Sequence, residues 1–341
     1  MQIFYSIVFC LIGVLFGQFE PADGLRENSP GVWALTHANV HIEPGTVLED
    51  ASIVIRDGLI EKVGREIRIP KDATILDMSG KTIYPGFIDS WVEISIQSEK
   101  TPPHDAHWNH KVNVRRELFS QYNPDKKKLE SLHKMGFTAA HIVPDSGIFQ
   151  GQTTLVQLNI EGTVLTSAVA QDIAYEVDGW NSDEYPNSLL GVVALLRQTL
   201  MDANWYRQAI AKTNQFSQVN EPLKENRDLD ILSDWRQGNK PFIFETKHEL
   251  TVLRSFNISD EFQLNSWIMA SGYEYRRISE IAKVNPFIIL PLDFPSTPDL
   301  TDPYQALSYS TSELKHWDMA PDNPAVLIEH GISVALTSNG L

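Results

Sequence analysis

The stretch MSGKTIYPGFIDSWVEI, residues 78–94, marks the point where one kind of sequence gives way to another. Upstream of it, three runs alternate apolar and polar side chains with the period of a strand, at residues 32–35, 51–55 and 59–63. Arg56-Asp57-Gly58 between two of these runs is typical of a hairpin turn. We therefore predict a small antiparallel β module over residues 18–84.

Downstream of the same stretch, short apolar runs alternate with helical stretches. The predicted strands are residues 87–94, 137–143, 241–245, 263–270, 286–290 and 332–336, and the predicted helices are residues 124–135, 188–212, 229–237, 248–254, 273–284 and 323–330. This alternation indicates a parallel sheet covered by helices, and so many units over about 250 residues favour an α/β barrel over an open sheet. We predict the barrel domain over residues 85–341, with an inserted hairpin near residues 151–169.

The composition is that of a globular protein. The 341 residues carry 28 Lys and Arg against 44 Asp and Glu, a formal net charge of −16, and 42% of them are hydrophobic. This apolar fraction excludes a disordered chain. Because an acidic surface repels polyphosphate and anionic lipid, we expect no nucleic acid and no membrane partner, and a small-molecule or protein partner instead.

The chain begins with an almost unbroken apolar run at residues 3–16, followed by Gly17 and a polar stretch. A helix of this length is shorter than the roughly 30 Å hydrocarbon core of a bilayer, so the run is typical of a signal peptide. We predict a signal peptide over residues 1–17 and export to the periplasm or the extracellular space. Cys10, the single cysteine, lies inside this run, which excludes thiol catalysis and cysteine metal sites in the exported chain.

Two parts of the sequence resemble the metal-dependent amidohydrolases, in particular the imidazolonepropionase-like branch. Residues 53–60, IVIRDGLI, and 78–89, MSGKTIYPGFID, are similar to the opening of that family, and residues 323–340, NPAVLIEHGISVALTSNG, to its approach to an eighth barrel strand. The resemblance implies a (β/α)8 TIM-like barrel beside a small β-sandwich-type module made from both chain ends. It also implies one or two divalent metals at the carboxyl ends of the strands, hydrolysing carbon–nitrogen bonds other than peptides, or related esters.

The first pair of metal ligands in that family is replaced in this sequence. The family's aspartate is followed by His-x-His, because residues two apart on a strand point to the same side and can bind one metal. Here the sequence reads Asp89-Ser90-Trp91-Val92-Glu93. The indole nitrogen of Trp91 is a donor only and cannot ligate a cation, whereas Glu93 could do so as a hard oxygen donor.

The other family positions are also substituted. The histidine of strand five falls at Glu245, that of strand six near Ser271, and the aspartate of strand eight at Asn339, whose amide cannot act as a general base. The usual hydrolytic mechanism cannot be assembled from these residues. We therefore expect no metal at the usual ligands, and retain Asp89, Glu93, Glu245 and Asn339 as the candidates at the catalytic positions.

Three interpretations of the carboxylates remain open. Glu93 and Glu245 pair with Arg or Lys, or are solvated at the barrel mouth. Alternatively, Glu93, Glu245 and Asn339 form an oxygen site for a divalent metal such as Mg²⁺ or Ca²⁺, with Zn and Mn as further candidates. In the third, two close carboxylates share a proton and act as acid and base without a metal.

The histidines are weaker candidates. His104, His107 and His110 follow the first barrel strand at three-residue steps, and metal binding would need a helical turn to bring them to one face. Pro102-Pro103 favours a loop, so we interpret them as exposed loop histidines beside a packed Trp108. His141 lies on an apolar strand and is predicted to be a core histidine with its hydrogen bonds satisfied.

Three functions follow from these observations. The preferred one is an amidohydrolase-related protein with a degenerate metal site, a pseudoenzyme that binds a ligand or a partner or supports a homologous domain. The second is an active hydrolase with an oxygen-rich metal site, so the sequence leaves enzymatic activity open. The third is a ligand-binding module lined by aromatic residues, with Trp91, Trp108, Trp180 and Trp205 as candidates.

The end of the chain also carries an expectation. The family continues beyond its eighth strand and returns to the β module, whereas this sequence stops at Leu341. We expect a barrel that is incomplete at the C-terminus and a partly apolar strand edge in the β module. The chain is then a fragment, a split gene product, or one half of an assembly completed by a complementing domain or a homo-oligomer.

Overall fold

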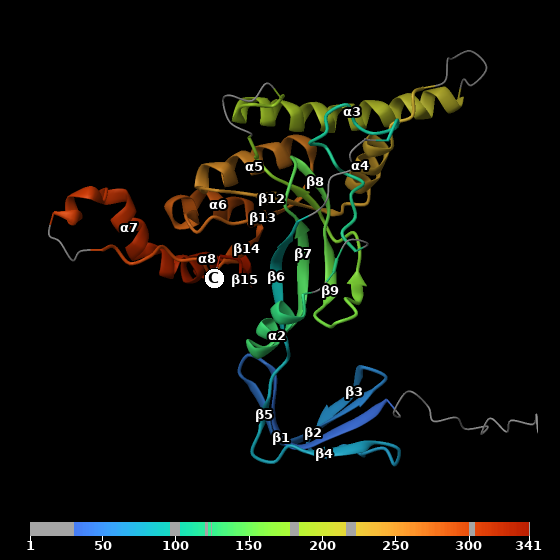
Figure 1. The fold of residues 1–341 in the computed structure, drawn as a ribbon, viewed down its shortest axis with the longest axis vertical. Coiled ribbons are helices and arrows are strands. Elements are labelled where there is room, and N and C mark those ends of the chain that lie inside the picture. The colour runs from blue at the N-terminus through green and yellow to red at the C-terminus, as the bar shows by residue number, and fades with distance from the viewer. Residues whose placement is uncertain are drawn as a thin grey trace, which may run out of the picture. The chain divides into compact units, whose positions relative to one another are not determined.

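The computed structural model describes residues 31–95, 103–119, 122–123, 125–177, 184–215, 223–299 and 304–340 (Figure 1). The chain divides into two compact units, Met1–Pro85 and Gly86–Leu341. The predicted signal peptide and Trp180 lie outside the described residues. No helix in the described ranges is long and apolar enough to cross a membrane.

The first unit is a five-stranded sheet. Strands β1 (Val32–Glu43), β2 (Thr46–Arg56), β3 (Leu59–Gly64) and β4 (Thr74–Asp77) follow the order β3-β2-β1-β4, and β5 (Thr82–Ile83) also pairs with β1. Asp57 and Gly58 have φ of 50° and 78°, which two-residue hairpin turns require. The pairs β1–β4 and β1–β5 are parallel, so the prediction of a purely antiparallel module is wrong. The connection after β3 is too long for a hairpin and carries the chain to the far side of β1.

The second unit contains two sheets. The smaller one has the order β10-β9-β7-β6, from β6 (Phe87–Ile94), β7 (Phe137–Pro144), β9 (Thr154–Gln157) and β10 (Val164–Thr166). The larger one has the order β15-β14-β13-β12-β11-β8, from β8 (Phe149–Gln152), β11 (Gln171–Ile173), β12 (Pro241–Glu245), β13 (Asn265–Met269), β14 (Phe287–Pro291) and β15 (Ser333–Thr337). Neighbouring strands from β11 to β15 are parallel, which confirms the mixed α/β class.

The eight-stranded parallel barrel does not close within the described residues. Between β7 and β11, the chain forms strands that pair antiparallel, β8 with β11 and β9 with β7 and β10. The physical reason is the short spacing: a parallel connection needs a crossover of about a dozen residues or more, and the turns around β8 and β9 are shorter. The antiparallel pair of β9 and β10 lies in the range predicted for an inserted hairpin, and the two sheets remain separate.

Helices and short 3-10 turns connect the strands of the second unit. They are α2 (Lys126–Lys134), α3 (Leu189–Gln215), α4 (Arg227–Gln237), α5 (Glu249–Phe262), α6 (Ile278–Val284), α7 (Thr311–Met319) and α8 (Asn323–Glu329), with short 3-10 turns at Glu274–Arg277, Gln305–Ser308 and Ala320–Asp322. Figure 1 shows α3 to α6 gathered over the larger sheet. Phe242 and Phe244 of β12 pack on this helical side. Ile243 between them belongs to a separate inner cluster, as the alternation of a strand requires.

Candidate ligand site at the strand ends

The carboxyl ends of the parallel strands bring together residues that are far apart in the sequence. Glu93 lies near the end of β6, Asp172 lies in β11, Glu245 ends β12, and Asn339 follows β15. Sites in barrels and in open parallel sheets form at this edge. The structure therefore places three of the predicted candidates, Glu93, Glu245 and Asn339, in the same part of the second unit.

Asp89 joins β6 to β15. Its Oδ1 accepts from the Thr337 hydroxyl at 2.6 Å and from the backbone N–H groups of Trp91 and Ser338, both at 3.3 Å. Its Oδ2 accepts from the Ser338 hydroxyl. The Asp89 side chain is fully buried. Because donors surround both oxygens, Asp89 connects two strands and its oxygens are not left free for a metal or a substrate.

Trp91 occupies the inner cluster, where the family resemblance implies a metal-binding histidine. The residue is 1% exposed and packs with Val143, Ala170, Ile243, Met269 and Ile289. Its indole Nε1 donates to Glu93 Oε1 at 3.1 Å, and Asn339 Nδ2 donates to the same oxygen at 3.3 Å. The Glu93 carboxylate is thus engaged by neutral donors, and no ion pair of Glu93 or Glu245 with Lys or Arg occurs in the described ranges.

Ser271 does not face the other candidates. Its backbone N–H and its hydroxyl both donate to Glu274 Oε1 at 2.8 Å. The buried Glu274 also accepts from the Gly272 N–H and from Asn323 Nδ2 at 2.9 Å. Ser271 therefore stabilises the turn after β13, and the proximity to the mouth implied by the family position does not give it a role there.

Asp172 is the residue of this site that sequence reasoning missed. Its side chain is fully buried, and neither carboxylate oxygen receives a hydrogen bond from an N–H or alcohol group among the described residues. Burial raises its pKa well above the ordinary value, and the nearby Glu245 raises the pKa further. The only sequence signal was a single acidic residue in a short strand, Gln171-Asp172-Ile173, with no motif around it.

Glu245 lies at the carboxyl end of β12, two residues after Ile243, which pairs with Asp172 of β11. Gln150 Nε2 donates to Glu245 Oε1 at 2.8 Å. Burial raises the pKa of Glu245 to about 8. The side-chain hydrogen bond with Asp172 and the charge of Lys247 oppose that rise, and the Glu93 and Glu176 carboxylates add to it. Two neighbouring carboxyl groups with raised pKa values resemble the predicted proton-sharing pair, although the partner of Glu245 is Asp172.

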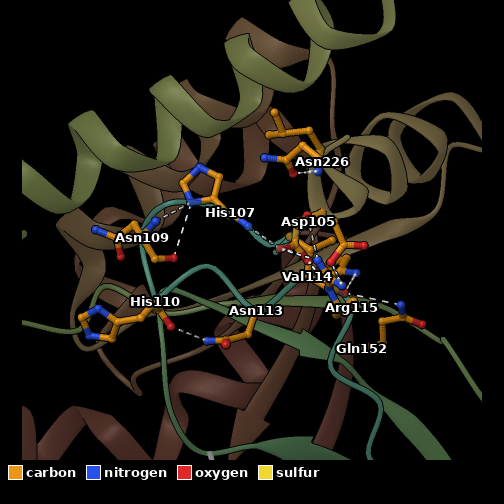
Figure 2. A network of polar contacts seen from close by, with 12 residues as sticks. Asp105, His107, Asn109, His110, Asn113, Val114, Arg115, Gln152 and Asn226 are labelled. Atoms are coloured by element: carbon orange, nitrogen blue, oxygen red, sulfur yellow. Dashed lines mark hydrogen bonds and ion pairs between the residues drawn. The ribbon is translucent and has the colours of Figure 1, made fainter. Parts of the chain in front are cut away.

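Figure 2 shows the loop that contains the three candidate loop histidines, with the rings of His107 and His110 apart. His107 is buried, its backbone N–H donates to Asp228, and its Nδ1 accepts from the Asn109 N–H at 3.1 Å. His110 Nε2 lies 3.2 Å from Glu184. His104 is exposed. The loop carries the three histidines in separate environments, and the interpretation of His107 as exposed is wrong because its ring packs into the loop.

Arg115 holds this loop in place. Its guanidinium contacts Asp105 Oδ1 and Asp228 Oδ1, both at 3.0 Å (Figure 2). Asp228 lies in the first turn of α4, which begins after Asn226, whose side chain accepts from the Leu229 N–H. These contacts fix the loop to a helix terminus, so the network is structural.

His141 lies inside the smaller sheet. The residue is 7% exposed, its Nδ1 lies 3.1 Å from the Ser90 carbonyl, and its Nε2 lies 2.7 Å from the Thr153 hydroxyl. Burial lowers the pKa of His141 to about 4, so the ring is neutral at physiological pH. Both ring nitrogens have a partner, as predicted for a core histidine.

The residues at the mouth do not fit the metal that the fold implies. Trp91 cannot ligate, and the facing Glu93 oxygen accepts from two N–H donors. Within the described ranges, no group of three or more His, Cys, Asp or Glu side chains is placed to hold a metal ion. We therefore derive no chemical step through a bound metal.

The chain is similar in structure to known hydrolases. No model of a known protein family matches it. An amidohydrolase from Thermotoga maritima has a TM-score of 0.71 and 19% sequence identity, over 89% of this chain and 78% of that one. A beta-aspartyl dipeptidase from Fervidobacterium islandicum covers 92% of this chain and 73% of its own, at 12% identity and a TM-score of 0.43, which is too low to carry an argument.

The similarity to curated sequences is local. Dihydropyrimidinase-related protein 5 of human and of rat is 41% identical over 54 residues, which are 14% of this chain and 10% of that protein. The match thus spans about a tenth of the length of these relatives. So short a match does not extend the activity of the whole relative to this chain. The similarity to the Thermotoga structure confirms the resemblance read from the sequence at the level of fold. The chain therefore has the fold of an amidohydrolase.

Proposed function

We propose that this chain belongs to the amidohydrolase superfamily and binds a small molecule at the strand ends without the family's metal-dependent hydrolysis. The observation that carries the proposal is Trp91, which places a buried indole where the family resemblance implies a histidine ligand. The indole N–H also engages Glu93, the nearest replacement ligand. Restoring a metal site would require replacing a core side chain as well as a surface one.

The test is metal analysis combined with activity. The purified chain is analysed for Zn, Mn, Fe and Mg by mass spectrometry and incubated with a panel of amides, lactams and dipeptides. We expect metal far below one ion per chain and no turnover above buffer. Stoichiometric metal together with hydrolysis of any panel member would contradict the proposal.

A second candidate function is an active hydrolase with an oxygen-rich site. It is favoured by the Glu93 carboxylate, which lies close enough to Glu245 to raise the pKa of that carboxyl group. In that case Glu93→Gln and Glu245→Gln each abolish turnover with added Mg²⁺ or Mn²⁺. Unchanged turnover in both variants would exclude it.

The aromatic-lined module receives less support. Trp91 is buried, whereas Trp108 and Trp205 are 65% and 59% exposed and lie on the loop after β6 and on α3. Export, and completion of the barrel by a further segment or a second copy of the chain, stay proposals. Secretion of the full chain, with N-terminal sequencing of the product, tests cleavage near Gly17.

A further inference from the structure

We propose that the mouth formed by Glu93, Glu245 and Asp172 binds a small molecule through a primary ammonium group. The ammonium group specifies the class of ligand for the site described above. The inference rests on the proposed function, because a metal bound by these carboxylates would exclude an ammonium group. Three buried oxygen atoms of this site can accept a hydrogen bond and receive none from an N–H or alcohol group.

These three atoms are Asp172 Oδ1, Asp172 Oδ2 and Gln150 Oε1, which we call the unfilled acceptors. All are buried and receive no hydrogen bond from an N–H or alcohol group among the described residues, and Asp172 forms its one side-chain hydrogen bond with the Glu245 carboxyl. Asp172 is fully buried and Gln150 is 1% exposed. A buried acceptor without a donor destabilises the fold, so three at one place favour an occupant that supplies donors.

The backbone explains why the unfilled acceptors lie together. In the pairing of β8 with β11, Gly151 faces Asp172 and Phe149 faces Ile173, so Gln150 is an extra residue in a bulge. The bulge directs Gln150 towards β12, where its Nε2 reaches Glu245. Asp172 faces Ile243 on β12, two residues before Glu245. Gln150, Asp172 and Glu245 thus converge from three adjacent strands.

The charge of the site selects a cation. Glu93, Glu176 and Glu245 all act electrostatically on this group of residues, and Lys247 is the cation that acts on Glu245. Glu93 is exposed, Glu245 is partly exposed and Asp172 is fully buried. The three carboxyl groups thus range from solvent-exposed to fully buried.

An ammonium group matches this arrangement. It carries three N–H donors and a positive charge, equal in number to the unfilled acceptors. A water molecule supplies two donors and no charge. A quaternary ammonium supplies charge and no donor, so these chemistries can be separated by experiment.

The experiment is a calorimetric titration of the purified full chain at pH 8.5 and constant ionic strength. Three probes share one alkyl chain: n-butylamine, n-butanol and butyltrimethylammonium. We expect saturable binding of n-butylamine only, at a stoichiometry of one. Equal binding of butyltrimethylammonium would show attraction by charge alone, and no binding of n-butylamine would show that water fills the site. Either result overturns the proposal.

Variants locate the binding. Glu245→Gln and Gln150→Leu should each weaken n-butylamine binding about tenfold or more, because each removes a charge or an acceptor. Glu161→Gln, on an exposed turn, is the matched control and should bind as the unmodified chain does. Binding that is the same in all variants would overturn the assignment of the site. Metal analysis of the same sample distinguishes this failure from that of the proposed function, which stoichiometric metal would contradict whatever the amine does.

Discussion

Two fully buried aspartates in one unit have opposite surroundings. Asp89 on β6 accepts from hydroxyl and backbone donors of Thr337, Ser338 and Trp91. Asp172 on β11 accepts from no donor in the described part of the chain. A buried carboxylate surrounded by donors stabilises a fold, whereas one without donors weakens it unless a proton or a ligand is bound. We therefore assign Asp89 to architecture and Asp172 to binding.

Removal of the satisfied carboxylate should have the largest effect. Asp89→Ala removes the acceptor of the Thr337 and Ser338 hydroxyls and of the Trp91 and Ser338 N–H groups from a buried position. We expect the free energy of unfolding to fall by about 3–5 kcal/mol, measured by urea denaturation. Asp77→Ala is the control, because Asp77 accepts from Ser79 on an exposed turn. A loss equal to that of the control would show that the hydrogen bonds of Asp89 with Thr337 and Ser338 do not contribute to the stability of the fold.

His141 is a buried histidine whose ring nitrogens both have hydrogen-bond partners and whose ring is neutral at physiological pH. Its pKa of about 4 lies below the ordinary 6.5, so the unfolded chain binds a proton between these values that the folded chain does not. Stability attributable to His141 is therefore lost as pH falls from about 6.5 to 4, by about 3 kcal/mol. His141→Gln should flatten this part of the pH profile. His330→Gln, at an exposed histidine, should leave the profile unchanged, and equal slopes in all three proteins would contradict the expectation.

Glu245 should show the opposite dependence. Its pKa of about 8 lies above the ordinary 4.5, so the folded chain holds a proton that the unfolded chain has released. The protein therefore loses stability as pH rises from about 4.5 to 8. Partial exposure of the carboxyl reduces the effect to about 2 kcal/mol. We compare the free energy of unfolding at pH 5 and at pH 8. Between these two pH values, the stability of Glu245→Gln should rise relative to that of the unmodified chain, whereas that of Glu161→Gln should not.

The smallest expected effect isolates one donor of Asp89. Thr337→Val keeps the shape of the side chain and removes the hydroxyl that donates to Oδ1 at 2.6 Å. We expect a loss of about 1.5 kcal/mol in chemical denaturation, because the other donors of Asp89 remain. Thr46→Val, at an exposed threonine that donates to Glu43, should change stability by less than about 0.5 kcal/mol. A similar loss in both variants would remove the distinction.

Much of the fold could be predicted from the sequence, because strand ends in a parallel sheet share an edge. That rule, applied to the positions that the family resemblance implies, placed Glu93, Glu245 and Asn339 in one region. The closed barrel that the sequence favoured does not form between β7 and β11, where β8 and β9 are four residues each. Periodicity over so few residues does not reveal strand direction, and the length of the connections decided it.

The candidate site was predicted less completely for a different reason. Trp91 was correctly identified as unable to ligate, since that follows from the chemistry of indole alone. Asp172 and Gln150 were missed because their importance comes from partners they lack, and only a folded structure shows which donors are within reach. The contacts of Ser271 could not be predicted, because its partner, Glu274, is set by the local turn after β13.

The β6–β15 joint also orders events in time. The hydrogen bond from Thr337 to Asp89 connects residues 248 positions apart. A ribosome adding about 5–20 residues per second needs roughly 10–50 s to cover that distance. During this interval β6 can pair with β7, while Asp89 faces water and its edge is open to other nascent chains. β15 is made long after β6, the strand whose Asp89 it contacts, and a chaperone that recognises open strand edges would have its opportunity before Thr337 emerges.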